Sequence, residues 1–363
     1  MQFSQIGFIG NWKIITLALL AALGLFGTTA TPAKSHCTNT ANAQDEKLKR
    51  FEVSKRVMGV EFGLIVYAKN LDQARKAIVA VFERLADLEE CMSDYDPDSE
   101  LSKLCKSAIP GHPFKVSDDL FEVLKISDSI YRTSNGSFDP TVGTLSKIWR
   151  KARATQTVPT KDVIQSAMKK VGWQHVKLDA KNHTVTFDKD QIQLDLGGIA
   201  KGFAADEAIR IFREQGLSIC LIDASGDVTV GDPPPGKKGW SIAISAEKGK
   251  RISLANGSVA SSGDRYQHLE KDGKRFSHII HPKTGWGMTD RRFVSVVTSN
   301  VKRPGTLADA LASAFSVMPL EDIKNQVKKF ECDGIRIDHV SKSDQTTVLA
   351  TGPLATGVKS PNE

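Results

Sequence analysis

An aspartate and a serine four positions apart are the first candidates for chemistry in this sequence. Asp309 and Ser313 lie in an apolar segment with helical periodicity, and residues four apart share one face of a helix. Two hard oxygen ligands, joined by a main-chain carbonyl and by phosphate oxygens, would suit Mg²⁺. The alternative is structural: Asp309 would favour the positive start of the helix, and Ser313 would hydrogen bond back to it.

A second candidate is the stretch of residues 193–206, which reads QLDLGGIAKGFAAD. Its pattern predicts an apolar strand that ends at 194–196, a glycine turn, and a helix that ends at Gly216. Two adjacent glycines let a ligand approach the main chain, and free N–H groups at a helix start favour an anion such as phosphate. Neither the Rossmann pattern nor the P-loop pattern is present.

Two charged residues flank this turn. Asp195 could accept hydrogen bonds from ribose or ring groups, and Lys201, one turn into the helix, could neutralise phosphate oxygens. The alternative is a tight packing turn with a lysine on the surface. The motif alone does not decide between these two interpretations.

A histidine beside a glycine-containing loop is a candidate general base. His278 begins the segment HIIHPKTG, and histidine is the side chain that titrates near neutral pH without help. The alternative is a structural histidine on a β-rich segment.

Several polar loops with glycines follow predicted strands or helices. Each one alone is a turn, but binding groups gather on loops that a rigid scaffold holds, so together they predict one shared ligand surface. The loops are 93–99, 134–139, 195–201, 225–227, 261–264 and 278–285.

The elements that must position these residues are a mixture of helices and strands. Periodicity and capping predict helices at 71–88, 117–133, 160–172 and 307–317, the last stopped by Pro319. Strands are predicted at 57–68, 175–178, 184–188, 191–194, 218–223, 240–245, 251–254, 258–262, 275–280, 292–298 and within 334–350. Many of these strands look antiparallel, so the fold class is α+β rather than a doubly wound parallel sheet.

The first 43 residues resemble an export signal. Lys13 precedes a short apolar run at 14–26, and Ala41-Asn42-Ala43 fits a cleavage site before Gln44. We therefore expect a signal peptide at 1–43, one domain at 44–363, and an exported, periplasmic protein. An uncleaved N-terminal anchor is the alternative.

Charge and cysteines limit the possible partners and the redox chemistry. The formal charge of +7 falls to +5 without the signal, and Lys and Arg are interspersed with nearly as many acids, which argues against nucleic acid as a partner. No Cys-x-x-Cys pattern is present. Cys91 and Cys105 could pair in an oxidising compartment, whereas Cys220 is predicted to be a buried strand thiol.

Taken in order, these loops resemble the ApbE family of flavin transferases, exported α+β enzymes. The resemblance runs from Met58-Gly59 to the helix of Asp309, and it implies largely antiparallel sheets with packed helices and a T-fold-like core. Its most specific pieces are 92–100, 136–141, 195–206, 262–264, 278–285 and 308–313.

The resemblance implies a reaction: FMN is transferred from FAD to a Ser or Thr of a target flavoprotein through a phosphoester bond, with Mg²⁺ and release of AMP. Membrane proximity would come through the acceptor. Gly198, through its carbonyl, would hold the metal with Asp309 and Ser313, and His278 would be the base for the acceptor hydroxyl. The residues implied for FAD are Met58, Tyr95, Ser137, Phe138, Asp139, Asp195, Lys201 and Ile280.

The sequence departs from the family pattern at four places. Ser313 replaces the usual Thr, Ala312 stands where some members have a further metal-site Asp, and His281 replaces the Asp of the His-x-x-Asp-Pro motif. Asp223-Ala-Ser-Gly also replaces Asn-Ala-Gly-Gly. A cationic His281 could alter the pKa of His278. Two rival functions stay open, an FAD pyrophosphatase and an exported flavin-binding protein without catalysis.

Overall fold

The structure, a computed structural model, describes residues 47–244, 250–265, 267–340 and 345–355. The predicted signal peptide at 1–43, its cleavage site and Gln44 lie outside the described residues. Among the described residues, no helix is both long enough and apolar enough to cross a bilayer.

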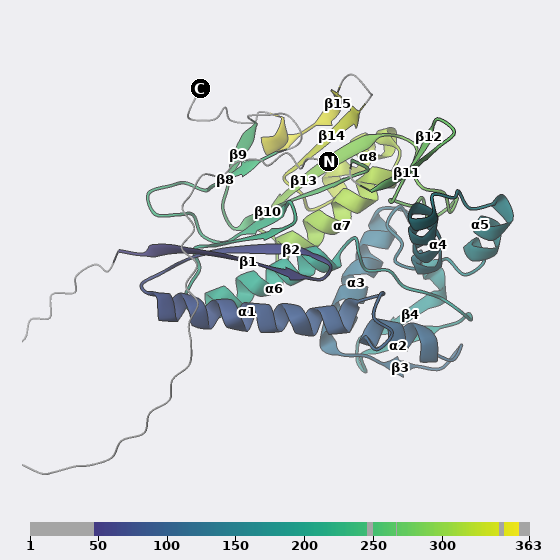
Figure 1. Cartoon of the computed structure of the whole chain (residues 1–363), viewed down its shortest axis with the longest axis horizontal. Helices are drawn as coiled ribbons and strands as arrows, with labels where there is room; N and C mark the ends of the chain where they lie inside the picture. The colour runs from purple at the N-terminus through teal and green to yellow at the C-terminus, as the bar shows by residue number, and fades with distance from the viewer. Residues whose placement is uncertain (1–46, 245–249, 266, 341–344, 356–363) are drawn as a thin grey trace, which may run out of the picture. The chain divides into compact units, whose positions relative to one another are not determined.

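An eight-stranded sheet with only antiparallel neighbours forms the centre of the domain (Figure 1). This confirms the predicted α+β class. In spatial order the strands are β1 (Lys49–Val57), β2 (Val60–Ala68), β6 (Cys220–Ala224), β7 (Asp227–Val230), β10 (Gly257–Gly263), β13 (Arg292–Ser299), β14 (Gly334–Val340) and β15 (Gln345–Ala350).

Three helices pack along this sheet and bury the main core. They are α1 (Leu71–Met92), α6 (Ala200–Glu214) and α7 (Pro304–Val317); α1 packs on α6, α6 on α7, and α7 on β10 and β13. Helix α1 turns Ala74, Val81, Leu85 and Leu88 inward at helical spacing. A separate apolar cluster joins the hairpin of β8 (Trp240–Ala243) and β9 (Arg251–Leu254) to the sheet.

The remaining elements gather beside one end of the central sheet in Figure 1. They are α2 (Glu100–Ser107), α3 (Asp118–Thr133), α4 (Gly143–Thr155), α5 (Lys161–Met168), the small sheet of β3 (Phe114–Lys115), β5 (Thr184–Phe187) and β4 (Val176–Asp179), and the hairpin of β11 (His268–Lys271) and β12 (Lys274–Ser277). Helix α8 (Leu320–Gln326) follows α7, and short 3₁₀ turns occupy Trp173–His175, Val327–Lys329 and Gly352–Leu354.

One predicted strand is absent, and one helix was not predicted. No strand forms at 191–194, where only an isolated bridge joins Val142 to Gln193, because this short apolar run packs into the core instead of entering a sheet. Residues 143–155 form α4, a helix that the sequence did not predict and that begins without a side-chain cap.

Cys91 and Cys105, which could have paired in an oxidising compartment, are both free thiols. Cys91 Sγ donates to Glu100 Oε2 at 3.3 Å, and Cys105 Sγ accepts from the Leu194 amide at 3.3 Å. Cys220 is a fully buried thiol on β6, as predicted.

Helices α6 and α7 meet so closely that glycine is required at the crossing. A Cβ on Gly202 would lie 2.1 Å from the Gly305 carbonyl oxygen and 2.9 Å from Asp309 Cβ. One turn further along α6, the buried Asp206 accepts from Gly305 N, Thr306 N and Thr306 Oγ1 at 2.6–2.8 Å. Asp206 therefore caps the start of α7 from a neighbouring helix. We call the whole region where the first turns of α6 and α7 pack together, with the glycine turn before α6, the α6–α7 junction.

The next residue of α6 strengthens the junction through ion pairs. Glu207 is paired with Arg84 of α1, with Arg210, and with Arg303, which immediately precedes α7. Burial alone would raise the pKa of Glu207, but the hydrogen bonds from these three guanidinium groups hold it at about 2. Glu207 is therefore ionised at neutral pH and connects three segments.

Asp206→Ala should destabilise the domain by about 2–3 kcal/mol, because two backbone donors and one hydroxyl at the start of α7 lose a buried acceptor. Urea unfolding followed by circular dichroism measures this. Ser117→Ala, which removes the cap of α3, is the matched control, and we expect a loss of about 1 kcal/mol. Equal, small losses for both variants would contradict the role assigned to Asp206.

Candidate active site

The centre of the candidate site is a lysine held between two acids at the α6–α7 junction. Lys201 Nζ lies 3.1 Å from Asp309 Oδ1 on α7 and 3.2 Å from Asp227 Oδ2 at the start of β7. Burial alone would lower the pKa of Lys201, yet the two carboxylates raise it, so the ammonium is charged. Lys201 is therefore a partly buried residue paired with two acids, and the alternative of a surface lysine was wrong.

Asp309 also receives a donor from the start of α6. The Gly202 amide donates to Asp309 Oδ2 at 3.0 Å. The sequence predicted that N–H groups at the start of α6 would bind an anion, and here one of them binds the Asp309 carboxylate. Asp309 stands in the second turn of α7 and is 5% exposed. The first turn contains no acidic residue, so the alternative of Asp309 as a helix-start acid was wrong.

The glycine turn and α7 approach each other at Gly198. A Cβ there would lie 2.8 Å from Ser313 Oγ and 3.3 Å from Phe138 Cε2, so only glycine fits between them. Within the described residues, Ser313 makes no hydrogen bond back to its helix, whereas Ser316 donates to the Ala312 carbonyl. The predicted metal residues Gly198, Asp309 and Ser313 therefore lie beside one turn of α7.

This donor set fits a hard cation. A carboxylate, a hydroxyl and a main-chain carbonyl are the oxygen ligands that Mg²⁺ prefers, with water and substrate oxygens completing its shell. Across the described part of the chain, no three His, Cys, Asp or Glu side chains are grouped for metal binding. The fit therefore depends on Asp309 together with neutral oxygens.

Asp227 is a member of this cluster that the sequence did not assign. Burial raises the pKa of Asp227 above its usual range, Lys201 opposes the rise, and the neighbouring Asp309 adds to it. Asp227 also accepts from the Ser261 amide at 2.8 Å, which ties the loop at 225–227 to the loop at 261–264. The two polar loops thus meet, as expected for a shared surface.

The backbone fixes one tautomer of His278. Its Nδ1 lies 3.1 Å from the Gln267 carbonyl oxygen, an acceptor, so Nδ1 carries the proton and Nε2 keeps its lone pair. Burial lowers the pKa of His278, the Gln267 hydrogen bond opposes this, and the charges of Arg153 and Lys201 lower the pKa further. Neutral His278 has a basic Nε2 at pH 7.

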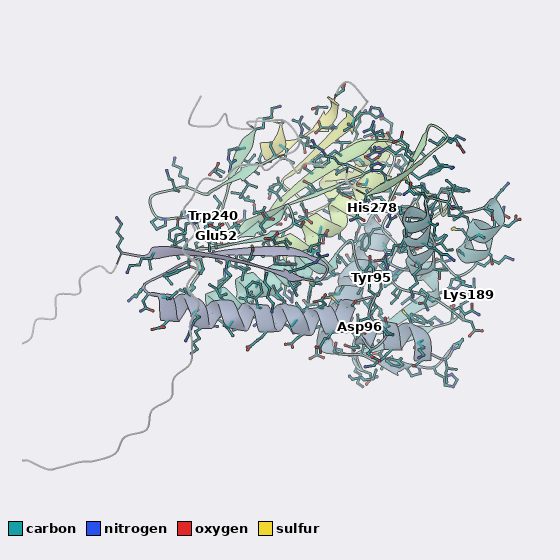
Figure 2. The ribbon with its side chains drawn as sticks, viewed as in Figure 1. Glu52, Tyr95, Asp96, Lys189, Trp240 and His278 are labelled. Carbon is teal, nitrogen blue, oxygen red and sulfur yellow. The ribbon has the colours of Figure 1, made fainter. Side chains whose placement is uncertain are left out.

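A third cluster joins Tyr95 to Asp195 through an arginine of the unpredicted helix. Arg150 of α4 lies 2.5 Å from Asp94 and 3.1 Å from Asp195, and its guanidinium carbon lies 4.0 Å from the centre of the Tyr95 ring. Tyr95 is 76% exposed. In Figure 2, Tyr95 and His278 lie toward the same end of the molecule, away from Trp240.

The sequence could have indicated Arg150, because Leu145, Trp149 and Ala152 have helical spacing. The glycine-rich loop before them concealed the start of the helix. Asp94 lies in the predicted loop at 93–99, but its partner comes from distant sequence. The ion pair between Asp94 and Arg150 therefore cannot be predicted from the residues next to either one.

The other predicted FAD residues are less closely associated with these groups. Asp139 is buried and accepts from Thr141 N, Thr141 Oγ1 and Trp173 N, so its carboxylate holds its own loop together. Ser137 is partly exposed in the same loop. Met58 occupies the β1–β2 turn with φ of 53°, and Ile280 is buried in the cluster around Trp149.

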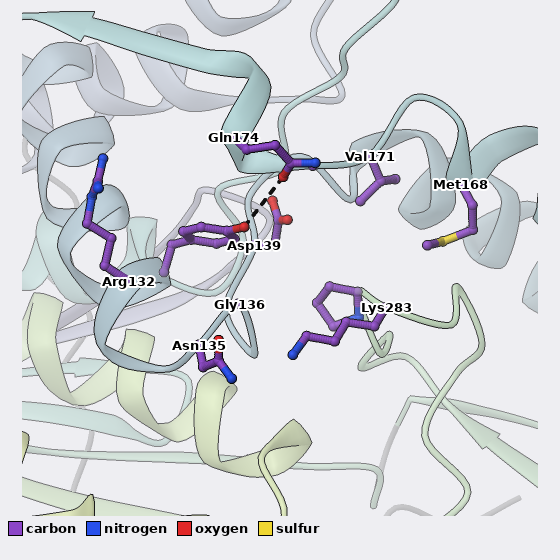
Figure 3. A pocket seen from close by; sticks show the side chains of 11 residues that line it. Arg132, Asn135, Gly136, Asp139, Met168, Val171, Gln174 and Lys283 are labelled. Carbon is purple, nitrogen blue, oxygen red and sulfur yellow. Dashed lines mark hydrogen bonds between the residues drawn. The ribbon is translucent and has the colours of Figure 1, made fainter.

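A cavity of about 320 Å³ lies next to two of the predicted loops (Figure 3). Gly136 and Asp139 line it from one loop, and Pro282 and Lys283 from the other. The Tyr131 hydroxyl lies 3.5 Å from Gln174 Oε1 at its wall. Lys201, His278 and Asp309 are not among its lining residues, so the predicted chemistry does not converge there.

His281 takes over a backbone contact that an aspartate could make. Its Nδ1 accepts from the Lys283 amide at 3.1 Å, and burial together with Lys283 lowers the pKa of His281. His281 is therefore neutral at pH 7, and its charge is not among those that shift the pKa of His278. The expected influence of a cationic His281 on His278 is not supported.

His281→Asn should change the free energy of unfolding by less than about 1 kcal/mol, because the amide oxygen can accept from Lys283, whereas His281→Ala should lose about 1 kcal/mol. Urea unfolding compares the two variants. An NMR titration should find the same pKa for His278 in the wild type and in His281→Asn. A clear shift would show that His281 acts electrostatically on His278.

Comparisons with known proteins identify relatives of this chain. Among curated proteins, an FAD:protein FMN transferase of Chlamydia muridarum is 31% identical over 244 residues, which cover 67% of this chain and 75% of that protein. An FAD:protein FMN transferase of Escherichia coli K12 is 26% identical over 340 residues, covering 90% and 92%.

Solved structures show the same fold. The flavin transferase ApbE from Vibrio cholerae superimposes with a TM-score of 0.75 at 23% identity, covering 86% of this chain and 100% of that one. The ApbE protein from Thermotoga maritima has a TM-score of 0.71 at 28% identity, covering 80% and 94%. The model of the ApbE family matches residues 58–335, an interval that includes every predicted site residue, and the chain belongs to that family.

Proposed function

We propose that this chain is an FAD:protein FMN transferase that attaches FMN to a Ser or Thr hydroxyl of a target flavoprotein and releases AMP. The observation that carries the proposal is the meeting of Gly198, Lys201, Asp309 and Ser313 at the α6–α7 junction, where a phosphate-binding cation and hard oxygen ligands stand together. The activity of the curated relatives supports it.

The proposed reaction forms one bond at phosphorus and breaks one, and it moves one proton. The acceptor oxygen bonds to the phosphorus of the FMN half of FAD, and the bond from that phosphorus to the bridging oxygen breaks, so that AMP leaves with the electron pair. The hydroxyl proton passes to Nε2 of His278, the nitrogen that the Gln267 hydrogen bond leaves free. A positioned base of this kind activates a neutral hydroxyl.

Asp309, Ser313 and the Gly198 carbonyl would hold Mg²⁺. Bound there, the ion would polarise the diphosphate and offset the charge on the departing AMP. Lys201 would offer its ammonium to the phosphate oxygens while it stays paired with Asp227. Tyr95 and Asp195, joined by Arg150, would receive the nucleotide at the exposed edge of the site.

The test is to incubate the purified chain with FAD, Mg²⁺ and a panel of candidate acceptor domains that carry Ser or Thr. Intact mass spectrometry should show an acceptor heavier by one FMN less one water, with one AMP released for each adduct. Free FMN without an acceptor adduct would instead indicate an FAD pyrophosphatase. Tight FAD binding without turnover under any divalent metal would indicate a non-catalytic flavin-binding protein.

We also propose that the enzyme is exported to the periplasm, on the sequence of residues 1–43. Expression of the full chain followed by fractionation and N-terminal sequencing tests this, with Gln44 expected as the first residue. A cytoplasmic protein that retains residues 1–43 would contradict the proposal.

A further inference from the structure

Two arginines one turn apart on α4 have very different surroundings. Positions three apart share a helix face, so Arg150 and Arg153 point toward the same side. Arg150 is satisfied by Asp94, Asp195 and the Tyr95 ring. Within the described part of the chain, the Arg153 guanidinium has no hydrogen bond and no ion pair; only its main-chain carbonyl accepts, from Gln156.

Helix α4 is held beside the loop of His278 by its buried tryptophan. Trp149 Nε1 donates to the Gly285 carbonyl at 2.9 Å, and the Trp149 ring lies 5.4 Å from that of Phe276 on β12. These contacts fix the helix against the hairpin that leads directly into His278. Arg153, four positions after Trp149, is therefore carried on a helix that packs against the hairpin preceding the candidate base.

The electrostatic surroundings agree with this placement. Burial lowers the pKa of Arg153, and the neighbouring charge of Arg150 lowers it as well, while Tyr95 acts in the opposite sense. Arg153 and Lys201 both lower the pKa of His278. His278 thus lies within the influence of one cation on α4 and another on α6, while the charge of Asp264 acts on its pKa in the opposite sense.

A partly buried guanidinium without a partner favours an anion, and its planar fork matches two phosphate oxygens. We propose that Arg153 binds the diphosphate of FAD from α4, as a second cation in addition to Lys201. The inference rests on the proposed function. Because Nε2 of His278 must reach the hydroxyl that attacks phosphorus, a cation whose charge acts on His278 also lies within electrostatic range of that phosphate.

Binding measurements with FAD and with riboflavin distinguish binding of the diphosphate by Arg153 from binding of the flavin ring. Arg153→Gln should weaken FAD binding about 10–100-fold, the loss expected for hydrogen bonds to a charged group, while binding of riboflavin, which has no phosphate, should not change. Arg153→Lys should recover part of the loss, because it keeps the charge without the fork. The control is Arg75→Gln, a change at an exposed position of α1 outside the candidate site.

Isothermal titration calorimetry with FAD and with riboflavin measures these affinities, and circular dichroism checks the fold of each variant. Unchanged FAD affinity with a raised KM for the acceptor would overturn the proposal and place Arg153 on the acceptor surface. Equal losses for FAD and riboflavin would also overturn it. A wild-type chain that binds no FAD would overturn the proposed function together with this inference.

Discussion

Asp309→Ala should abolish Mg²⁺-dependent FMN transfer, with a loss of at least about a hundredfold in kcat, because the proposed metal site has this one carboxylate among neutral oxygens. The fold should survive. Lys201 keeps Asp227 as its partner, so the substitution leaves no isolated buried charge. AMP release and acceptor mass, followed as Mg²⁺ is titrated, measure the effect.

Two variants make this expectation specific. Asp309→Asn keeps the shape and an acceptor for the Gly202 amide but lacks the charge, so it should be nearly as inactive as the alanine variant. Ser316→Ala removes only a hydrogen bond within α7 and should leave transfer within about twofold of the wild type. Full Mg²⁺-dependent activity in Asp309→Ala would remove this residue from the site.

His278→Ala should slow transfer by about 10²–10⁴-fold while FAD affinity changes much less, because a general base acts on the acceptor hydroxyl rather than on FAD binding. Single-turnover transfer kinetics and FAD titration separate the two quantities. His112→Ala, at an exposed histidine outside the candidate site, is the control. Unchanged transfer kinetics in His278→Ala would exclude it as the base.

The pH dependence of transfer follows from the same histidine. The base must be neutral, and burial lowers the pKa of His278 below its ordinary value. The rate should therefore rise with pH on the acid side of 6.5 and be level at neutral pH, since deprotonation is by then complete. This acid limb should disappear in His278→Gln. A limb that persists in that variant would belong to another group.

Local signals predicted much of the fold. Ser117 caps α3 through the Leu120 amide, and α7 ends just before Pro319, as the sequence indicated. Each signal acts within one turn of its own helix, so neighbouring residues suffice to read it. The i, i+4 spacing of Asp309 and Ser313 and the glycines at 197–198 likewise indicated which residues could share a ligand.

The remaining part of the site depends on partners far apart in sequence. The sequence left Lys201 open between a phosphate-binding residue and a surface residue, and the packing of α7 brings Asp309 to it. The loop at 225–227 was expected on the shared surface, but its sequence did not indicate that Asp227 would pair with Lys201. Arg150 lies on a helix whose start resembles a loop. Local pattern thus identified several groups, but the tertiary packing determines their protonation and their partners.

The α6–α7 junction has a consequence for when the enzyme becomes competent during its synthesis. Helix α6 ends at Glu214, whereas α7 begins only at Pro304, so a nascent chain carries Lys201 and Asp206 long before their partners on α7, Asp309 and Gly305, are made. Contacts of such large sequence separation form late in folding. Chains that stop short of α7 lack Asp309 and Ser313, so a truncated chain should have no competent site.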